Sequence, residues 1–172
     1  VQELSGQSKD LLQPNAQIPF WFNIGGGYKS SDGWQAMQPA GYYDTFGPEL
    51  SFAESLGVRL EDEQIAIAKF THSGSQMNDW TPQGTDAKQR HIYPQFVEFI
   101  KEVRRDIERR GNKCEIAGVF YHVGENEMSM PPYRQQAAKW LAETVAGVRQ
   151  DLQQPSLPWF VSQQEPTDHE RV

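Results

Sequence analysis

The chain has 172 residues, with 16 Lys or Arg against 23 Asp or Glu and a formal net charge of −7. This length suits one domain, so we expect residues 1–172 to form a single domain. The acidic balance disfavours nucleic acid or an anionic membrane as partner, because clustered cations drive phosphate binding. No apolar run approaches the roughly 20 residues needed to cross a bilayer, and the single cysteine, Cys114, excludes an intrachain disulfide.

Four short runs rich in β-branched or aromatic residues predict strands. The second and third are apolar at nearly every position, which is typical of strands covered by helices on both faces. The sequence therefore favours a mainly parallel sheet. The four runs are Ile18–Phe22, Ile65–Phe70, Ile116–Val123 and Trp159–Val161.

Three stretches between these runs have apolar residues at three- and four-residue spacing, which predicts helices. They are Pro48–Leu56, Tyr93–Arg110, with Gly111 as its C-terminal cap, and Pro132–Leu152. Alternating strands and helices predict an open α/β sandwich with right-handed crossovers.

Two long irregular stretches, Asn23–Thr45 and Thr71–Ile92, leave the C-terminal ends of predicted strands. Long loops in a compact domain are usually functional, and loops at this edge of an open α/β sheet form the ligand crevice. Their aromatic residues are core residues or platforms for sugar rings, and we leave both interpretations open. These residues are Trp34, Tyr42, Tyr43 and Trp80.

Gly74 and Ser75 come just after the second predicted strand. A glycine followed by a small hydroxyl residue can direct a backbone N–H at a developing oxyanion, because no side chain blocks close approach. A plain polar turn is the alternative. His72 and Asp79 can in principle pair as acid and base, although a histidine at a strand end is more often structural.

The segment after the third predicted strand places Glu125, Asn126 and Glu127 directly after Gly124. Like charges at close range repel unless something binds or fixes them, so this segment is a candidate site. Two roles stay open for Glu125: direct catalysis, or anchoring of backbone N–H groups in a loop.

Two further motifs carry less weight. The Gly25–Gly27 run lacks the residues of a Walker loop and the spacing of a dinucleotide fingerprint, so no nucleotide is expected. Ser8, in Gly6-Gln7-Ser8, has the form of a nucleophile turn, but no apolar strand precedes it. We interpret it as part of a polar loop.

Four blocks, in this order, resemble the sialate O-acetylesterase domain, the carbohydrate-esterase branch of the SGNH hydrolases, which includes acetylxylan esterases. The likeness extends from about Ile18 to Gln164. The blocks are Phe46-Gly47-Pro48-Glu49, Ser73-Gly74-Ser75 with Asp79-Trp80, Tyr121-His122-Val123-Gly124-Glu125, and Leu157-Pro158-Trp159-Phe160-Val161.

The resemblance implies a three-layer α/β sandwich with a mainly parallel, flavodoxin-like sheet. It also implies a serine esterase that removes acetyl groups from sugars, in a secreted or periplasmic location. An acetylated carbohydrate is the expected partner, and no metal or cofactor is expected. We assign the oxyanion hole to Gly74 and Ser75, a catalytic role to Glu125, and substrate binding to His122 and Trp80.

Two blocks of the family lack a full match. Gly6-Gln7-Ser8 lacks the Asn-Met that completes the nucleophile block, and Asp168-His169 lacks the two-residue spacer of the Asp-x-x-His block. We expect both blocks outside Val1–Val172. The triad is then incomplete, so the isolated chain should be inactive and Ser8→Ala should change nothing.

Val123 stands where the family has Gln, which removes a hydrogen-bond donor. This motivates an alternative of another class, a degenerate domain that binds glycans without hydrolysing them. A structural domain that binds protein partners has only the aromatic loops in its favour.

Overall fold

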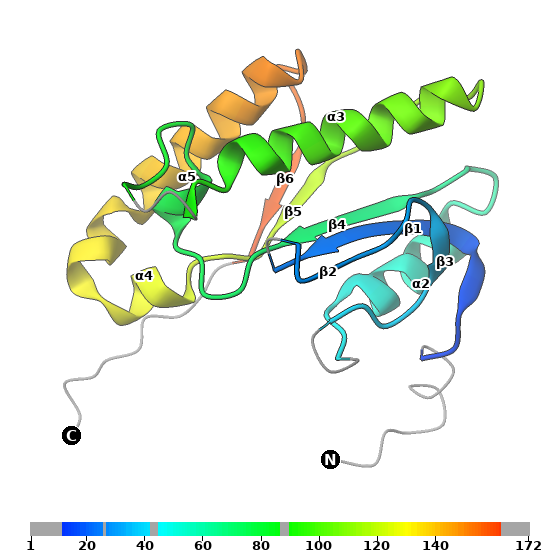
Figure 1. Ribbon diagram of the computed structural model, residues 1–172, viewed down its shortest axis with the longest axis horizontal. Coiled ribbons are helices and arrows are strands. Elements are labelled where there is room, and N and C mark those ends of the chain that lie inside the picture. The colour runs from blue at the N-terminus through cyan, green and yellow to red at the C-terminus, as the bar shows by residue number, and fades with distance from the viewer. Residues whose placement is uncertain (1–11, 26, 42–44, 87–89, 163–172) are drawn as a thin grey trace. The chain divides into compact units, whose positions relative to one another are not determined.

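The computed structural model describes residues 12–25, 27–41, 45–86 and 90–162. Ser8, Tyr42, Tyr43, Asp168 and His169 lie outside them. The chain divides into two compact units, Val1–Ser73 and Gly74–Val172, and each is described by itself. Both units combine helices with strands, so the chain has an α/β composition (Figure 1).

The first unit contains β1 (Asn15–Ile24), β2 (Lys29–Ser30), β3 (Gln35–Met37), α2 (Glu49–Arg59) and β4 (Ile67–Thr71). Successive side chains of a strand point to opposite faces, and β1 buries Ile18, Phe20, Phe22 and Ile24 on one face. Leu50 and Ala53 of α2 join the same core.

The sheet of the first unit differs from the predicted parallel arrangement. β4 pairs with β1 in parallel, but β2 and β3 pair with β1 antiparallel, so two of the three pairings are antiparallel. The reason lies in the stretch that was predicted to be irregular. Gly25 and Gly27 have φ of +65° and +97° there, and this conformation lets the chain turn back along β1.

The second unit contains the 3₁₀ helix η2 (Met77–Trp80), α3 (Tyr93–Arg109), β5 (Val119–Tyr121), α4 (Glu125–Ser129), α5 (Pro131–Asp151) and β6 (Trp159–Val161). β5 and β6 pair in parallel. The Trp80 ring packs edge-on against Phe96 of α3 and Tyr121 of β5. The Tyr93 hydroxyl donates to Asp151 at 2.7 Å and joins α3 to the end of α5.

The four predicted strands and three predicted helices are all present, with shifts of a few residues at their ends. The second and third predicted strands each lie in a parallel pair, as β4 and β5. They are less covered than predicted, since Phe120 of β5 is 63% exposed. Gly111 follows α3 with φ of +82°, as suits a residue that ends a helix.

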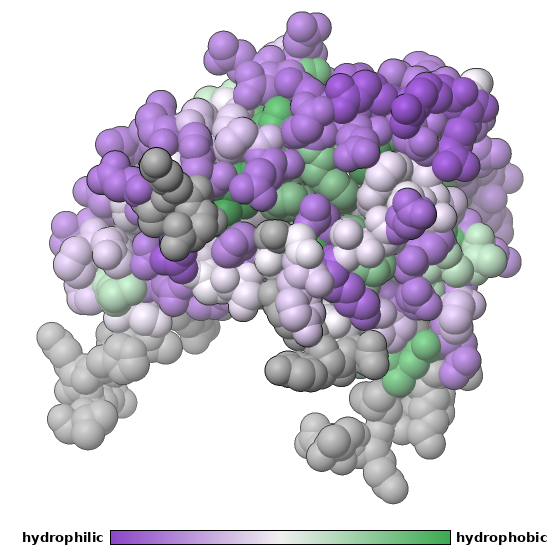
Figure 2. All heavy atoms as spheres, viewed as in Figure 1, coloured by the Kyte–Doolittle hydropathy of each residue, from purple (hydrophilic) through white to green (hydrophobic). Residues whose placement is uncertain are grey.

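Charged residues gather at the C-terminal part of α3, in the hydrophilic region at the upper right of Figure 2. Arg104 pairs with Glu108, while Arg109 and Arg110 both pair with Asp106. Exposed pairs of this kind add little stability, so they mark a solvated face. Across the described ranges, no helix combines the length and the apolar character that a bilayer span requires.

Candidate functional site

The turn at Gly74 and Ser75 leads into η2. Gly74 has φ of +67°, a conformation that favours glycine, and its carbonyl accepts a hydrogen bond from Arg90. Ser75 is buried, and its hydroxyl accepts from the Trp80 indole N–H at 3.0 Å. The turn is therefore tied to its own downstream segment on both sides of the Gly74–Ser75 peptide.

Asp79 stabilises the start of η2. Its carboxylate is fully buried, and it accepts from the Gln76 backbone N–H at 2.7 Å and from the Thr85 hydroxyl at 2.9 Å. Arg90 lies 3.8 Å from the same carboxylate. Asp79 is thus occupied by groups of its own loop, and the possible pairing of Asp79 with His72 stays a prediction.

The start of α4 contacts the segment that follows Gly74. The Met77 backbone N–H donates to Glu127 Oε1 at 2.9 Å, and the Asn126 side chain donates to the Ser75 carbonyl at 3.2 Å. These two bonds join residues about 50 positions apart in the chain. The structure therefore brings together the two segments that the sequence marked as candidate sites.

Gly124 and Glu125 lie at the start of α4 and differ in exposure. Gly124 is buried with φ of +144°, and its N–H donates to the exposed Glu125 carboxylate at 3.0 Å. The carboxylate that anchors backbone in the other loop is that of Glu127, which is fully buried. Glu125 and Glu127 thus each accept a backbone N–H, Glu125 from its own loop and Glu127 from the other one.

Tyr121, the last residue of β5, lies near the acids Glu127, Asp79 and Glu125. Its ring is buried, and among the described residues its hydroxyl has no hydrogen-bond partner. Burial raises the pKa of Tyr121, and the nearby charges of Glu127, Asp79 and Glu125 raise it further. The phenol therefore stays protonated to a higher pH than a tyrosine in water.

His122 and Ser162 lie beside each other where β5 and β6 end. The His122 ring is exposed, and its Nδ1 is 2.6 Å from the Ser162 hydroxyl. The Ser162 N–H also donates to the Tyr121 carbonyl at 3.1 Å, which extends the strand pairing by one bond. His122 is therefore held at the C-terminal edge of the parallel pair, where ligands of α/β sheets bind.

Trp80 does not present a face for sugar stacking. Its side chain is 4% exposed and lies between the rings of Phe96 and Tyr121, with its N–H on Ser75. The sequence left a core role and a sugar-binding role open for this residue, and in the structure its ring packs with buried aromatic residues. Trp34 is half-buried, and its ring packs edge-on against Trp21.

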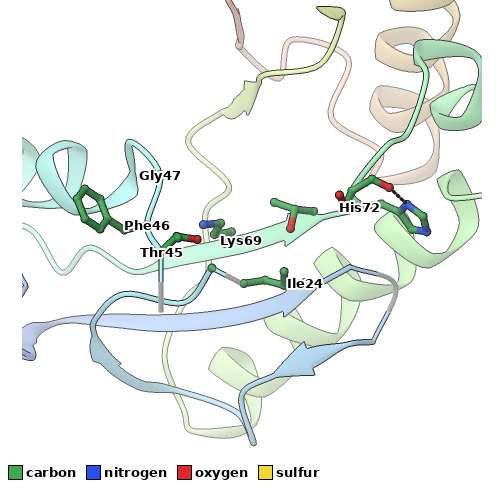
Figure 3. A pocket seen from close by; sticks show the side chains of 9 residues that line it. Ile24, Thr45, Phe46, Gly47, Lys69 and His72 are labelled. Carbon is green, nitrogen blue, oxygen red and sulfur yellow. Dashed lines mark hydrogen bonds between the residues drawn. The ribbon is translucent and has the colours of Figure 1, made fainter. Parts of the chain in front are cut away.

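A separate crevice of about 270 Å³ lies in the first unit, at the C-terminal ends of the parallel strands β1 and β4. Figure 3 shows Lys69 and Thr45 beside each other in it, with Ile24 on β1 and Phe46 to one side. Lys69 is not an isolated cation, because Glu49 Oε1 accepts from its ammonium group at 2.8 Å. None of the five residues assigned from the sequence lines this crevice. These residues are Gly74, Ser75, Trp80, His122 and Glu125.

In the ranges that the structure describes, no group of three or more His, Cys, Asp or Glu side chains is placed to hold a metal ion.

Sequence reasoning missed Glu127 and Ser162 as individual residues. Glu127 was part of the acidic segment after Gly124, but sequence alone did not tell which acid turns inward. Ser162 follows a predicted strand directly, whereas His122 lies inside the predicted run Ile116–Val123. Because β5 ends at Tyr121, both residues follow parallel strands in the structure, and the sequence did not show this.

Comparisons with known proteins agree with these features. A family model described as "carbohydrate esterase, sialic acid-specific acetylesterase" matches residues 27–171. No protein among those with curated functions matches the chain.

Two solved structures share the fold. A protein from Arabidopsis thaliana is 20% identical, with a TM-score of 0.67 over 93% of this chain and 60% of that chain. A carbohydrate acetylesterase from Xanthomonas citri is 16% identical, with a TM-score of 0.64 over 91% of this chain and 37% of that chain. The chain thus spans less than two thirds of either structure. The family match covers most of the chain, which therefore belongs to the carbohydrate esterases described as sialic acid-specific acetylesterases.

Proposed function

We propose that the protein is a serine carbohydrate esterase that removes O-acetyl groups from sugars by acyl transfer. The observation that carries this proposal is the pair of hydrogen bonds from Asn126 to Ser75 and from Met77 to Glu127. They hold the turn that matches the family's oxyanion block against the segment that matches its Gly-Glu block. Family membership supplies the reaction class.

The Gly74–Ser75 backbone is the proposed oxyanion hole. In acyl transfer a serine attacks the acetyl carbonyl, and the carbonyl oxygen gains negative charge that aimed N–H groups stabilise. The positive φ of Gly74 supports this role, because it permits a backbone direction that other residues adopt at a cost. Burial of Ser75 supports it further, since a fixed turn needs no reorganisation during the reaction.

His122 and Glu125 are the proposed contacts with the acetylated sugar. Both side chains are exposed next to buried neighbours, so a ligand can reach them without a change of fold. Imidazole and carboxylate groups both hydrogen-bond to sugar hydroxyls. Trp80 has a supporting role in this proposal, because its N–H fixes the Ser75 side chain.

We also propose the three-layer sandwich with a mainly parallel sheet as the architecture of the enzyme. The parallel pairings of β1 with β4 and of β5 with β6 support it.

The test is hydrolysis of p-nitrophenyl acetate by the 172-residue chain and by the full-length gene product, followed by Gly74→Ala in whichever is active. We expect kcat to fall roughly 10- to 100-fold, because a displaced oxyanion donor costs about that much or more. Gly111→Ala is the matched control. Gly111 also has positive φ, and a methyl group there meets open space beyond α3.

Both glycine variants should lose stability, by about 1–2 kcal/mol each, but only Gly74→Ala should lose activity. Equal kcat values for the two variants would exclude the oxyanion role of Gly74. A full-length product that binds acetylated sugars without hydrolysing them would replace the esterase by the glycan-binding alternative.

A further inference from the structure

Glu127 occupies an unusual position for an acid. Its side chain is fully buried, and Oε1 accepts the Met77 N–H at 2.9 Å. In the part of the chain that the structure describes, Oε2 is buried without a hydrogen-bond partner, and no salt bridge to Glu127 is found. A buried carboxylate with half of its capacity unused is unfavourable for folding, so its presence calls for another explanation.

The bond from Met77 acts on a particular piece of backbone. Met77 is three residues after Gly74 and is the first residue of η2, whose other polar ties come from the same loop. The side chain of Asn126, the residue before Glu127, donates to the Ser75 carbonyl. The side chains of residues 126 and 127 are thus the described links between α4 and the backbone of residues 75–77.

We propose that Glu127 is a positioning residue for acyl transfer, which holds the Gly74–Ser75 backbone in the conformation that receives the acetyl oxygen. This inference rests on the esterase function proposed above. Glu127 does not contact the substrate, because it is fully buried. It acts through its hydrogen bond with the Met77 amide. The role depends on how far the acceptor oxygen reaches and not on the charge, which has no partner among the described residues.

Two substitutions separate reach from charge. Glu127→Gln keeps the length and an acceptor oxygen but removes the charge. Glu127→Asp keeps the charge but is one methylene shorter, so its oxygen cannot remain 2.9 Å from the Met77 N–H without movement of the backbone. Tyr93→Phe is the control, because it removes a partly buried hydrogen bond from the same unit, between α3 and Asp151.

Each variant is made in the full-length gene product and measured in two ways. Hydrogen–deuterium exchange follows the peptide that covers residues 75–80, and steady-state kinetics with p-nitrophenyl acetate gives kcat and KM. For Glu127→Asp we expect exchange in residues 75–80 to rise about tenfold or more. Its kcat should fall roughly 10- to 100-fold with KM nearly unchanged, as expected for a misplaced catalytic group.

Glu127→Gln should stay within about threefold of the wild type in both measurements, since it keeps the acceptor. Tyr93→Phe should lower the unfolding midpoint and leave kcat unchanged. If Glu127→Asp does not fold, Asn126→Ala takes its place, because it removes the neighbouring bond from a half-buried side chain. The same pattern is expected at smaller amplitude.

The inference is overturned if Glu127→Asp leaves exchange in residues 75–80 at the wild-type rate. It is also overturned if its kcat falls no further than that of Tyr93→Phe, or if Glu127→Gln is as impaired as Glu127→Asp. An inactive wild type would instead refute the proposed function. The exchange measurement would still show whether Glu127 holds the segment.

Discussion

Each unit contains a buried glutamate that accepts a backbone N–H, but only one of the two carboxylates is paired with a cation among the described residues. Glu49, at the start of α2, accepts from Gly47 at 3.1 Å and from the Lys69 ammonium at 2.8 Å. Glu127, in α4, accepts from Met77 at 2.9 Å, and its second oxygen is buried and unpartnered among the described residues. One charge is compensated and the other is not.

This difference separates two uses of the same side chain. Glu49 and Lys69 form a self-contained pair, 8% and 17% exposed, that fastens α2 to β4. Such a pair fits a structural role, since the attraction between the two charges offsets part of the cost of their desolvation. Glu127 has no such partner among the described residues, so its position is better explained by the backbone that its hydrogen bond holds in place.

The largest effect should come from Lys69→Met, which leaves the Glu49 carboxylate buried without its cation. Removal of one partner from a buried pair typically costs about 3–5 kcal/mol. Because Lys69 is partly exposed, we expect a loss of about 2–3 kcal/mol in the free energy of unfolding, measured by urea denaturation. The control is Lys139→Met, which breaks an exposed pair with Glu143 at 3.9 Å. A loss no larger than that of the control would show that the Glu49–Lys69 pair does not fasten α2.

The second effect compares one substitution at both glutamates. Glu49→Gln removes a charge-assisted hydrogen bond and should cost about 1–2 kcal/mol. Glu127→Gln keeps its acceptor for Met77 and removes an uncompensated charge, so the free energy of unfolding should change by less than about 0.5 kcal/mol or rise. Urea denaturation of both variants in one buffer measures the difference. Equal losses at the two positions would remove the distinction between them.

The smallest effect concerns two tyrosines of the second unit. The pKa of Tyr93 is raised by burial first and then by its bond to Asp151, and that of Tyr121 by burial and by the nearby acids. At neutral pH, Tyr93→Phe should cost about 1 kcal/mol because a bond is lost, whereas Tyr121→Phe should cost close to nothing.

The same two residues predict a dependence on pH. The folded state holds both phenolic protons more tightly than the unfolded chain, whose tyrosines titrate near 10. Their contribution to stability is therefore complete below that value and is lost as pH rises above it. Unfolding curves at about pH 8 and about pH 11 should show a smaller alkaline loss in each Phe variant than in the wild type. An unchanged alkaline loss in both variants would contradict the proton linkage.

Elements with a long local pattern could be predicted from the sequence. The apolar stripe of Tyr93–Arg110 and the aromatic run Trp159–Val161 each define an element without knowledge of the rest of the chain. β2 and β3 have two and three residues, and this is too short for any periodicity to show. Their antiparallel pairing follows from the turn at Gly25 and Gly27, which was weighed only as a phosphate loop.

The candidate site was predictable to the level of the segment but not of the side chain. Gly74, Ser75 and the Gly124–Glu127 stretch were identified because unusual residues follow strands. Which partners they choose depends on contacts across about 50 positions, such as Met77 with Glu127. Trp80 shows the same limit, since only its packing against Phe96 and Tyr121 decides between core and surface.

The start of α4, with Gly124 as its N-cap and Glu125 as its first residue, fixes a choice between two acids. An α-helix turns by about 100° per residue, so residues 125 and 127 lie on nearly opposite sides of it. Only one of the two can face the interior, and the residue at which the helix begins decides which. Insertion or deletion of one residue before α4 would turn the segment by about 100° and move Glu127 away from the interior. During evolution, the length of this connection should therefore be constrained more tightly than its composition.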